Sequence, residues 1–222
     1  MIHKEEPIMT ALLKKDLYLV GKQSWILLGI ALLFSLTPQF ESFGSAYLMV
    51  LTLTLPLTTL AYDERCHWDT YLSMTPCRPE RVVCSKYLFA VLLALAALAV
   101  TLLTGMLKSI FVREEYDLMG NMVQRISLLM VILTANAITM PTVFRFGVEK
   151  GRLTMMALMF GTFGIIVGGA RLIGADRMFG WLDAIPLAAL GIVAAAVVIM
   201  ANVVSFFLSV RFYRKRCAGA YD

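Results

Sequence analysis

The chain has 222 residues, of which 59% are hydrophobic and 16% are charged, and its formal net charge is +5 at pH 7. Because an ordinary globular domain is only about half apolar, this composition excludes a typical water-soluble fold and predicts a polytopic membrane protein. The positive charge favours attraction to a membrane surface, and no base-reading or phosphate-tracking motif indicates a nucleic-acid partner. Charged residues interrupt the segment 1–23, so we expect no cleavable signal peptide.

The first predicted element is an amphipathic helix over residues 9–22. Apolar residues recur there at helical spacing, namely Met9, Leu12, Leu13, Leu17 and Val20. Most lysines of the segment fall on the other side, a pattern typical of a helix that lies in the plane of the membrane interface. Asp16 interrupts the apolar face, so the alternative is that this segment simply extends the first membrane span.

The rest of the chain is dominated by long apolar stretches. A membrane-spanning helix needs roughly 20 mostly apolar residues. Six stretches approach or meet this requirement, at about 24–40, 43–62, 87–107, 126–144, 153–171 and 184–208. The first is the weakest, because Pro38 follows a short apolar core. The sequence therefore predicts an all-α fold in which residues 1–222 form a single transmembrane domain with six spans.

The distribution of basic residues predicts the orientation of these spans. If the N-terminus is cytoplasmic, the outer segments hold only Lys108, Arg113, Arg125, Arg171 and Arg177. Every other lysine and arginine then falls on the inner side, as the positive-inside rule requires. We therefore expect a multi-pass protein of the cytoplasmic membrane with both termini and the 63–86 loop in the cytoplasm.

The 63–86 loop is the densest run of charged and aromatic residues in the chain. Asp63 is suited to cap a short helix, and Pro76 is suited to end it. One face of that helix would carry four residues at helical spacing, namely Trp68, Tyr71, Leu72 and Thr75. A simpler interpretation is that Trp68 and Tyr71 are interfacial anchors. Anchoring alone does not explain so long a loop, and we favour a helix that contacts a cytoplasmic partner.

Polar and small residues also occur inside the predicted spans. The polar ones are Asn136, Asn202 and Ser205, and pairs of small residues are Ala90 with Ala94 and Gly164 with Gly168. The polar groups are candidates to line a cavity, although hydrogen bonds between helices explain them more simply. The small pairs permit close helix packing, either within the chain or with another copy.

Motifs for chemistry are missing from the sequence. No Gly-x-x-x-x-Gly-Lys-Ser/Thr loop is present, and no catalytic set of Ser, His and Asp is visible. Cys66, His67, Cys77 and Cys84 lie close together in sequence but lack the Cys-x-x-Cys spacing of a zinc site. We therefore expect no enzyme activity, no metal and no cofactor in this chain.

The loop resembles the permease subunits of type-two ABC transporters. The residues that carry the resemblance are Asp63-Glu64-x-x-x-Trp68, Pro76, Arg78 or Arg81, and Val83-x-Ser85-Lys86-Tyr87. Within that family the chain looks like the compact permeases of bacterial peptide exporters, such as those for phenol-soluble modulins, bacteriocins or lantibiotic immunity. The resemblance implies a homodimer of permeases with two ATPase subunits, which would bind the ATP and Mg²⁺.

Within that resemblance, the helix around 63–75 is the coupling helix that inserts into the ATPase subunit. Apolar contact would come from Trp68, Tyr71 and Leu72, and a polar rim from Asp63, Glu64, Arg65, Asp69, Arg78 and Arg81. Few charges occur within the predicted spans, which argues against ion-coupled transport and favours a hydrophobic or amphipathic substrate such as a peptide. The alternative function is a scaffold or sensor that docks a cytoplasmic partner without transporting anything.

Overall fold

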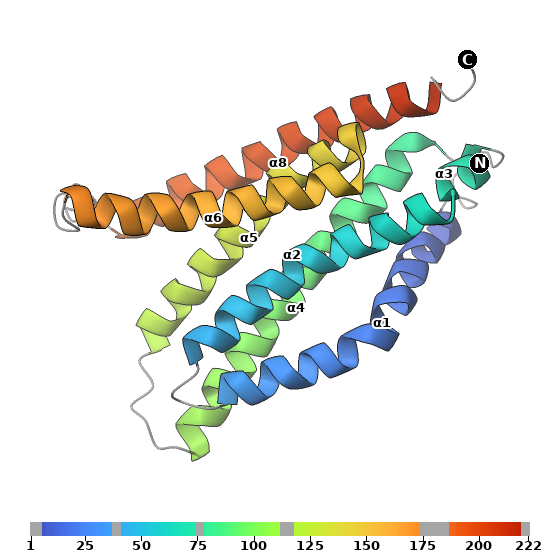
Figure 1. The fold of residues 1–222 in the computed structure, drawn as a ribbon. Helices are drawn as coiled ribbons and strands as arrows, with labels where there is room; N and C mark the ends of the chain where they lie inside the picture. The colour runs from blue at the N-terminus through green and yellow to red at the C-terminus, as the bar shows by residue number, and fades with distance from the viewer. Residues whose placement is uncertain (1–5, 37–40, 74–77, 112–117, 174–186, 219–222) are drawn as a thin grey trace.

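The computed structural model describes residues 6–36, 41–73, 78–111, 118–173 and 187–218, and these parts of the chain are helical apart from short turns. The helices are α1 (Glu6–Leu36), α2 (Glu41–Arg65), α3 (Trp68–Ser73), α4 (Pro79–Phe111), α5 (Leu118–Phe146), α6 (Val148–Ile173) and α8 (Leu187–Ala218). The long helices alternate in direction (Figure 1). As a result, α1, α4 and α6 begin at the end of the molecule where α2, α5 and α8 finish. The short helix α3 lies there, and we call this the α3 end.

Three helices within the described ranges are long and apolar enough to cross a membrane. These segments are Pro79–Leu107, Met122–Phe146 and Leu190–Lys215. They coincide with the third, fourth and sixth stretches that the sequence analysis selected. The other three predicted spans fall largely within α1, α2 and α6, so they are helical, but their place in a membrane stays a prediction.

The interior is built by packing between the long helices. Contacts are most extensive between α5 and α8, and between α1 and α2, with α5 also packing on α6 and α1 on α4. The fully buried side chains include Leu53, Phe89, Ile132 and Met140 from α2, α4 and α5. Ala90 and Ala94 are buried too, and Ala94 faces α5, so this small pair serves packing within the chain.

No break in the helix separates the predicted interfacial helix at 9–22 from the first predicted span. Residues Glu6–Leu36 form one continuous helix, which bends partway along its length (Figure 1). In its first half, Leu12, Asp16 and Val20 are buried, whereas Leu17 is half exposed. The buried stripe therefore includes Asp16 and packs on the protein, because Lys86 of α4 supplies an ion-pair partner for that carboxylate. Whether the first half of α1 also touches the membrane interface stays a prediction.

The prediction that Asp63 caps a new helix is wrong. Asp63 lies in the last turn of α2, which continues to Arg65. His67 ends α2, because its φ of 50° is left-handed and incompatible with a right-handed helix. The His67 carbonyl then accepts hydrogen bonds from the amides of Thr70 and Tyr71, so the same residue begins α3. Thr75, Pro76 and Cys77 lie outside the described residues.

His67 offers a direct test of this turn. A β-branched residue is strongly disfavoured at positive φ, and glycine is not. We expect His67→Val to be less stable than His67→Gly by about 1–2 kcal/mol, the cost of a left-handed conformation with a Cβ. The free energy of unfolding of the purified protein in detergent would be compared for the two variants.

Arg65, which is exposed in the last helical turn two residues earlier, provides the matched control. There the order should reverse, since glycine is a poorer helix former than valine. If the glycine variant were the more stable one at both positions, or the valine variant at both, the left-handed turn at His67 would be contradicted.

Candidate functional site

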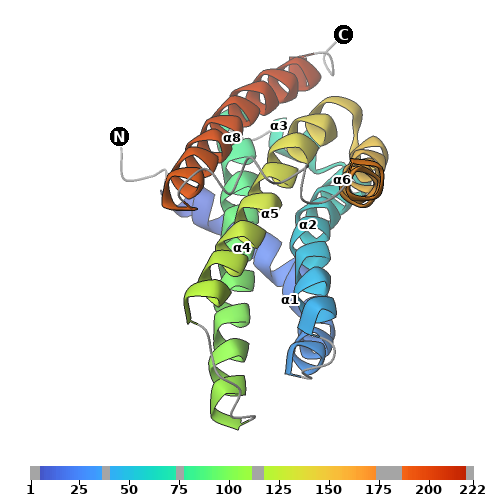
Figure 2. The same ribbon diagram turned by 90° about the vertical axis from the view of Figure 1, so that its left-hand side faces the viewer.

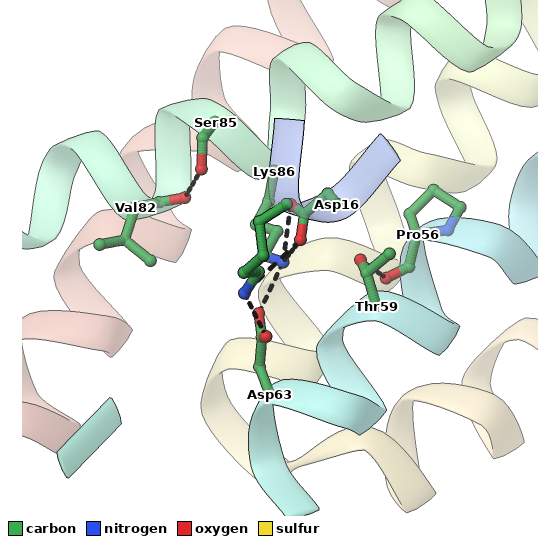
Figure 3. Close-up of polar contacts among 8 residues, drawn as sticks. Asp16, Pro56, Thr59, Asp63, Val82, Ser85 and Lys86 are labelled. Carbon is green, nitrogen blue, oxygen red and sulfur yellow. Dashed lines mark hydrogen bonds and ion pairs between the residues drawn. The ribbon is translucent and has the colours of Figure 1, made fainter. Parts of the chain in front are cut away.

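Four charged residues form a largely buried ion cluster at the α3 end, and this cluster consists of Lys15, Asp16, Asp63 and Lys86. Figure 3 labels Asp16, Asp63 and Lys86. The Lys86 ammonium lies 2.8 Å from one Asp16 carboxylate oxygen and 2.6 Å from Asp63. Lys15 lies 2.5 Å from Asp63 and 3.6 Å from Asp16. Asp16 and Lys86 are only 1% and 3% exposed. The cluster therefore joins α1, α2 and α4 by charge contacts inside the protein.

The composition of the cluster makes its burial tolerable. A buried ion without a partner costs several kcal/mol, whereas two carboxylates and two ammonium groups compensate one another. The sequence analysis assigned neither Lys15, Asp16 nor Lys86 to the site, and it placed Asp63 on a polar rim. The available signal was Asp16, an acidic residue on an otherwise apolar helix face.

Helix α3 is attached to this cluster through Trp68. The Lys15 ammonium lies 4.3 Å from the centre of the Trp68 ring, which is a cation–π contact. The Tyr71 ring stacks on the Trp68 ring, with ring centres 5.0 Å apart, but Tyr71 remains 58% exposed. Leu72 is buried in the core. The residues of the predicted apolar face therefore do not act together. Trp68 and Leu72 hold α3 on the bundle, while Tyr71 points outward.

Glu64 links the same region to a further helix. One carboxylate oxygen of Glu64 accepts a hydrogen bond from the backbone amide of Val148, 3.1 Å away, at the start of α6. A carboxylate is favourable there because the first amides of a helix have no partner within the helix. Gly147, with φ of 88°, makes the turn from α5 and lies so close to Glu64 that a Cβ would be 3.1 Å from it. The end of α2 is thus fastened to α6 as well.

The remaining predicted contact residues lie around this joint. Arg65 and Arg78 are exposed, and Arg81 is partly exposed near the start of α4. The amide of Arg81 donates to the carbonyl of Arg78, which begins α4. Nothing is described for the side chain of Asp69. The predicted contact residues that are exposed, among those that the structure describes, are therefore Glu64, Arg65, Tyr71 and Arg78.

The polar residues inside the predicted spans form hydrogen bonds between helices. Ser205 on α8 donates to the Ala137 carbonyl on α5 at 2.6 Å, and Asn202 donates to the Leu133 carbonyl at 3.4 Å. The Tyr87 hydroxyl on α4 bonds both Ser205 and Ser209. These contacts favour the bundle-stabilising interpretation, and Tyr87, which the sequence analysis did not assign, is their centre. A cavity role for Asn136, Asn202 and Ser205 stays a prediction.

Asn136 and Arg125 extend the buried polar groups along α5. The amide nitrogen of Asn136 has no hydrogen-bond partner within the described residues. Arg125 is 8% exposed and donates to the Thr101 carbonyl on α4. Together with the ion cluster, Arg125 shows that the interior holds more charge than the sequence analysis expected. Partners that lie on different helices cannot be recognised from local sequence.

We expect Lys86→Met to destabilise the protein strongly. Removal of the Lys86 ammonium leaves two carboxylates with only the Lys15 ammonium, and breaking a buried ion pair typically costs about 3–5 kcal/mol. The free energy of unfolding in detergent measures the effect. The double variant Lys86→Met with Asp16→Leu should recover part of the loss, because it removes one of the uncompensated charges.

Lys150→Met on α6 is the matched control, since Lys150 is exposed. Its effect should stay within about 0.5 kcal/mol, as for most surface substitutions. If Lys86→Met cost no more than this control, the ion cluster would have no role in stability.

Comparison with known proteins agrees with the membrane assignment. Neither a curated protein nor a solved structure gives a significant match to the chain. A sequence profile described as ABC-2 family transporter protein matches residues 11–214, a range that contains the ion cluster, α3 and nearly all of the three apolar segments. A protein of this family is the transmembrane component of an ABC transporter, is not itself catalytic, and pairs with an ABC ATPase subunit. The chain belongs to the ABC-2 transporter family.

Proposed function

We propose that the chain is the permease of an ATP-driven exporter in a bacterial cytoplasmic membrane. Two copies would form the translocation path for an amphipathic peptide, and each would dock one ATPase subunit through α3. The observation that carries this proposal is the geometry of α3. This six-residue helix presents Tyr71 outward while its other face is fixed to the bundle.

The attachment of α3 supports a coupling role. A force applied at Tyr71 passes to Trp68 by ring stacking and to α1 through Lys15. The ion cluster extends the connection to α2 and α4, and Glu64 extends it to α6. Packed side chains and ion pairs transmit displacement because they have few alternative arrangements. A movement of the docked ATPase would therefore shift four long helices together.

The lengths of the helices support six membrane crossings. The three helices that we add as spans, α1, α2 and α6, contain 31, 25 and 26 residues. Each exceeds the roughly 20 residues that a bilayer requires. Their alternating directions bring the inner basic segments of the sequence analysis to the α3 end (Figure 1). That arrangement favours a cytoplasmic position for α3 and for both termini.

The surroundings of the helices support the proposed substrate class. The carboxylates of the ion cluster are neutralised by two lysines, so neither is free to carry an ion across the membrane. Large apolar side chains, including Phe160, Ile192 and Phe207, are exposed on α6 and α8. A second copy or an amphipathic substrate would suit such surfaces better than a polar solute.

We expect Tyr71→Ala to weaken ATPase binding without changing permease stability. Tyr71 is exposed, and loss of an aromatic hot spot costs about 2 kcal/mol or more, which corresponds to roughly 30-fold weaker binding. The measurement is recovery of the ATPase subunit with the tagged permease from its native membrane, identified by mass spectrometry. Trp68→Ala should additionally uncouple ATP hydrolysis from transport, because it removes the contact with Lys15.

Tyr18→Ala is the matched control, since Tyr18 is 84% exposed on α1 rather than on α3. Equal ATPase recovery with Tyr18→Ala and Tyr71→Ala would show that α3 is not the docking element. Recovery of the ATPase without flux of an amphipathic peptide in reconstituted vesicles would instead support the scaffold or sensor function.

A further inference from the structure

A groove of about 750 Å³ lies at the α3 end, away from the ion cluster. It is bounded by the start of α4, the end of α8 and Met9 of α1. These parts of α4 and α8 are in contact, and Figures 1 and 2 show them next to one another. The lining has a charged part and an apolar part.

The charged part is strongly basic. Four basic side chains line the groove, namely Arg81, Arg211, Arg214 and Lys215, against the single acidic residue Glu80. Glu80 on α4 is paired with Arg214 on α8, so the pair connects two walls of the groove. Arg211 and Lys215 are exposed one helical turn apart, and neither has an ion-pair partner within the described residues. The groove therefore keeps uncompensated positive charge.

The apolar part lies along α8 on the N-terminal side of Arg211 and Lys215. Phe206 packs edge-to-face on Tyr87, and Val210 is buried at the floor of the groove. Phe207 is 66% exposed and forms part of the wall. All three belong to the apolar segment Leu190–Lys215, whose last turn carries the basic residues. Apolar surface and charge thus follow one another along α8.

We propose that this groove binds an anionic phospholipid of the cytoplasmic leaflet. The phosphate would lie against Arg211 and Lys215, and an acyl chain would lie along Phe206, Phe207 and Val210. Basic residues at the cytoplasmic end of a membrane helix attract anionic headgroups, and guanidinium groups match phosphate oxygens in geometry. The inference uses the cytoplasmic position proposed for the α3 end, but it requires neither the ATPase nor a peptide substrate.

The test is lipid retention by the full chain in detergent, measured by native mass spectrometry after titration with phosphatidylglycerol or phosphatidylcholine. Wild type should bind phosphatidylglycerol at least ~10-fold more tightly than phosphatidylcholine, because the groove has excess positive charge. Each basic residue near an anionic lipid contributes about fivefold, so Arg211→Gln with Lys215→Gln should weaken phosphatidylglycerol binding about 25-fold.

Lys150→Gln with Arg152→Gln is the matched control, because it makes the same change in net charge at two exposed residues of α6 outside the groove. This control should retain wild-type binding. Equal losses in both double variants, or no preference of wild type for phosphatidylglycerol, would overturn the proposal. Displacement of the lipid by equimolar glycerol 3-phosphate would also overturn it, because the groove would then be a site for soluble phosphates.

Discussion

The ion cluster of Lys15, Asp16, Asp63 and Lys86 is the constraint on which the arrangement of the α3 end depends. An acidic residue on a helix face that packs against apolar neighbours is costly unless a positive charge meets it there. Lys86 meets Asp16 at 2.8 Å, and this contact determines which face of α1 turns toward α4. The same ammonium lies 2.6 Å from Asp63, so the orientation of α2 is fixed relative to both helices. One side chain thus specifies the register of three helices.

The turn between α2 and α3 depends on that register. Asp63 is held by the ion cluster, the next residue, Glu64, reaches the amide of Val148 at the start of α6, and α2 ends one residue later at Arg65. His67 achieves this with a left-handed backbone and passes directly into α3. Trp68 then lies over Lys15, which belongs to the cluster itself. The position of the outward-facing Tyr71 is therefore determined by charges buried beneath it.

Local sequence predicted the helical elements well but not the contacts between them. The apolar stretches predicted the helices, and the charged and aromatic run at 63–86 predicted the region where α3 lies. The ion cluster was missed because its partners are 48 and 70 residues apart, as in Lys15 with Asp63 and Lys86 with Asp16. Asp63 was interpreted as a cap because a cap and a buried ion look alike in one sequence. The periodicity of apolar residues identifies the buried face of each helix, but it does not identify which helix packs against that face.

The distribution of strong contacts has a mechanical consequence for the coupling role that we propose for α3. The ion pairs of the cluster and the bond from Glu64 to α6 all lie at the α3 end. Away from this end, α6 and α8 diverge from α1, α2 and α4 (Figures 1 and 2). Helices joined at one end act as levers, so a small rotation at the joint displaces their far ends by more. Since the hydrogen bonds of Ser205 and Tyr87 tie α8 to α5 and α4 near the joint, the freedom for such displacement lies beyond them.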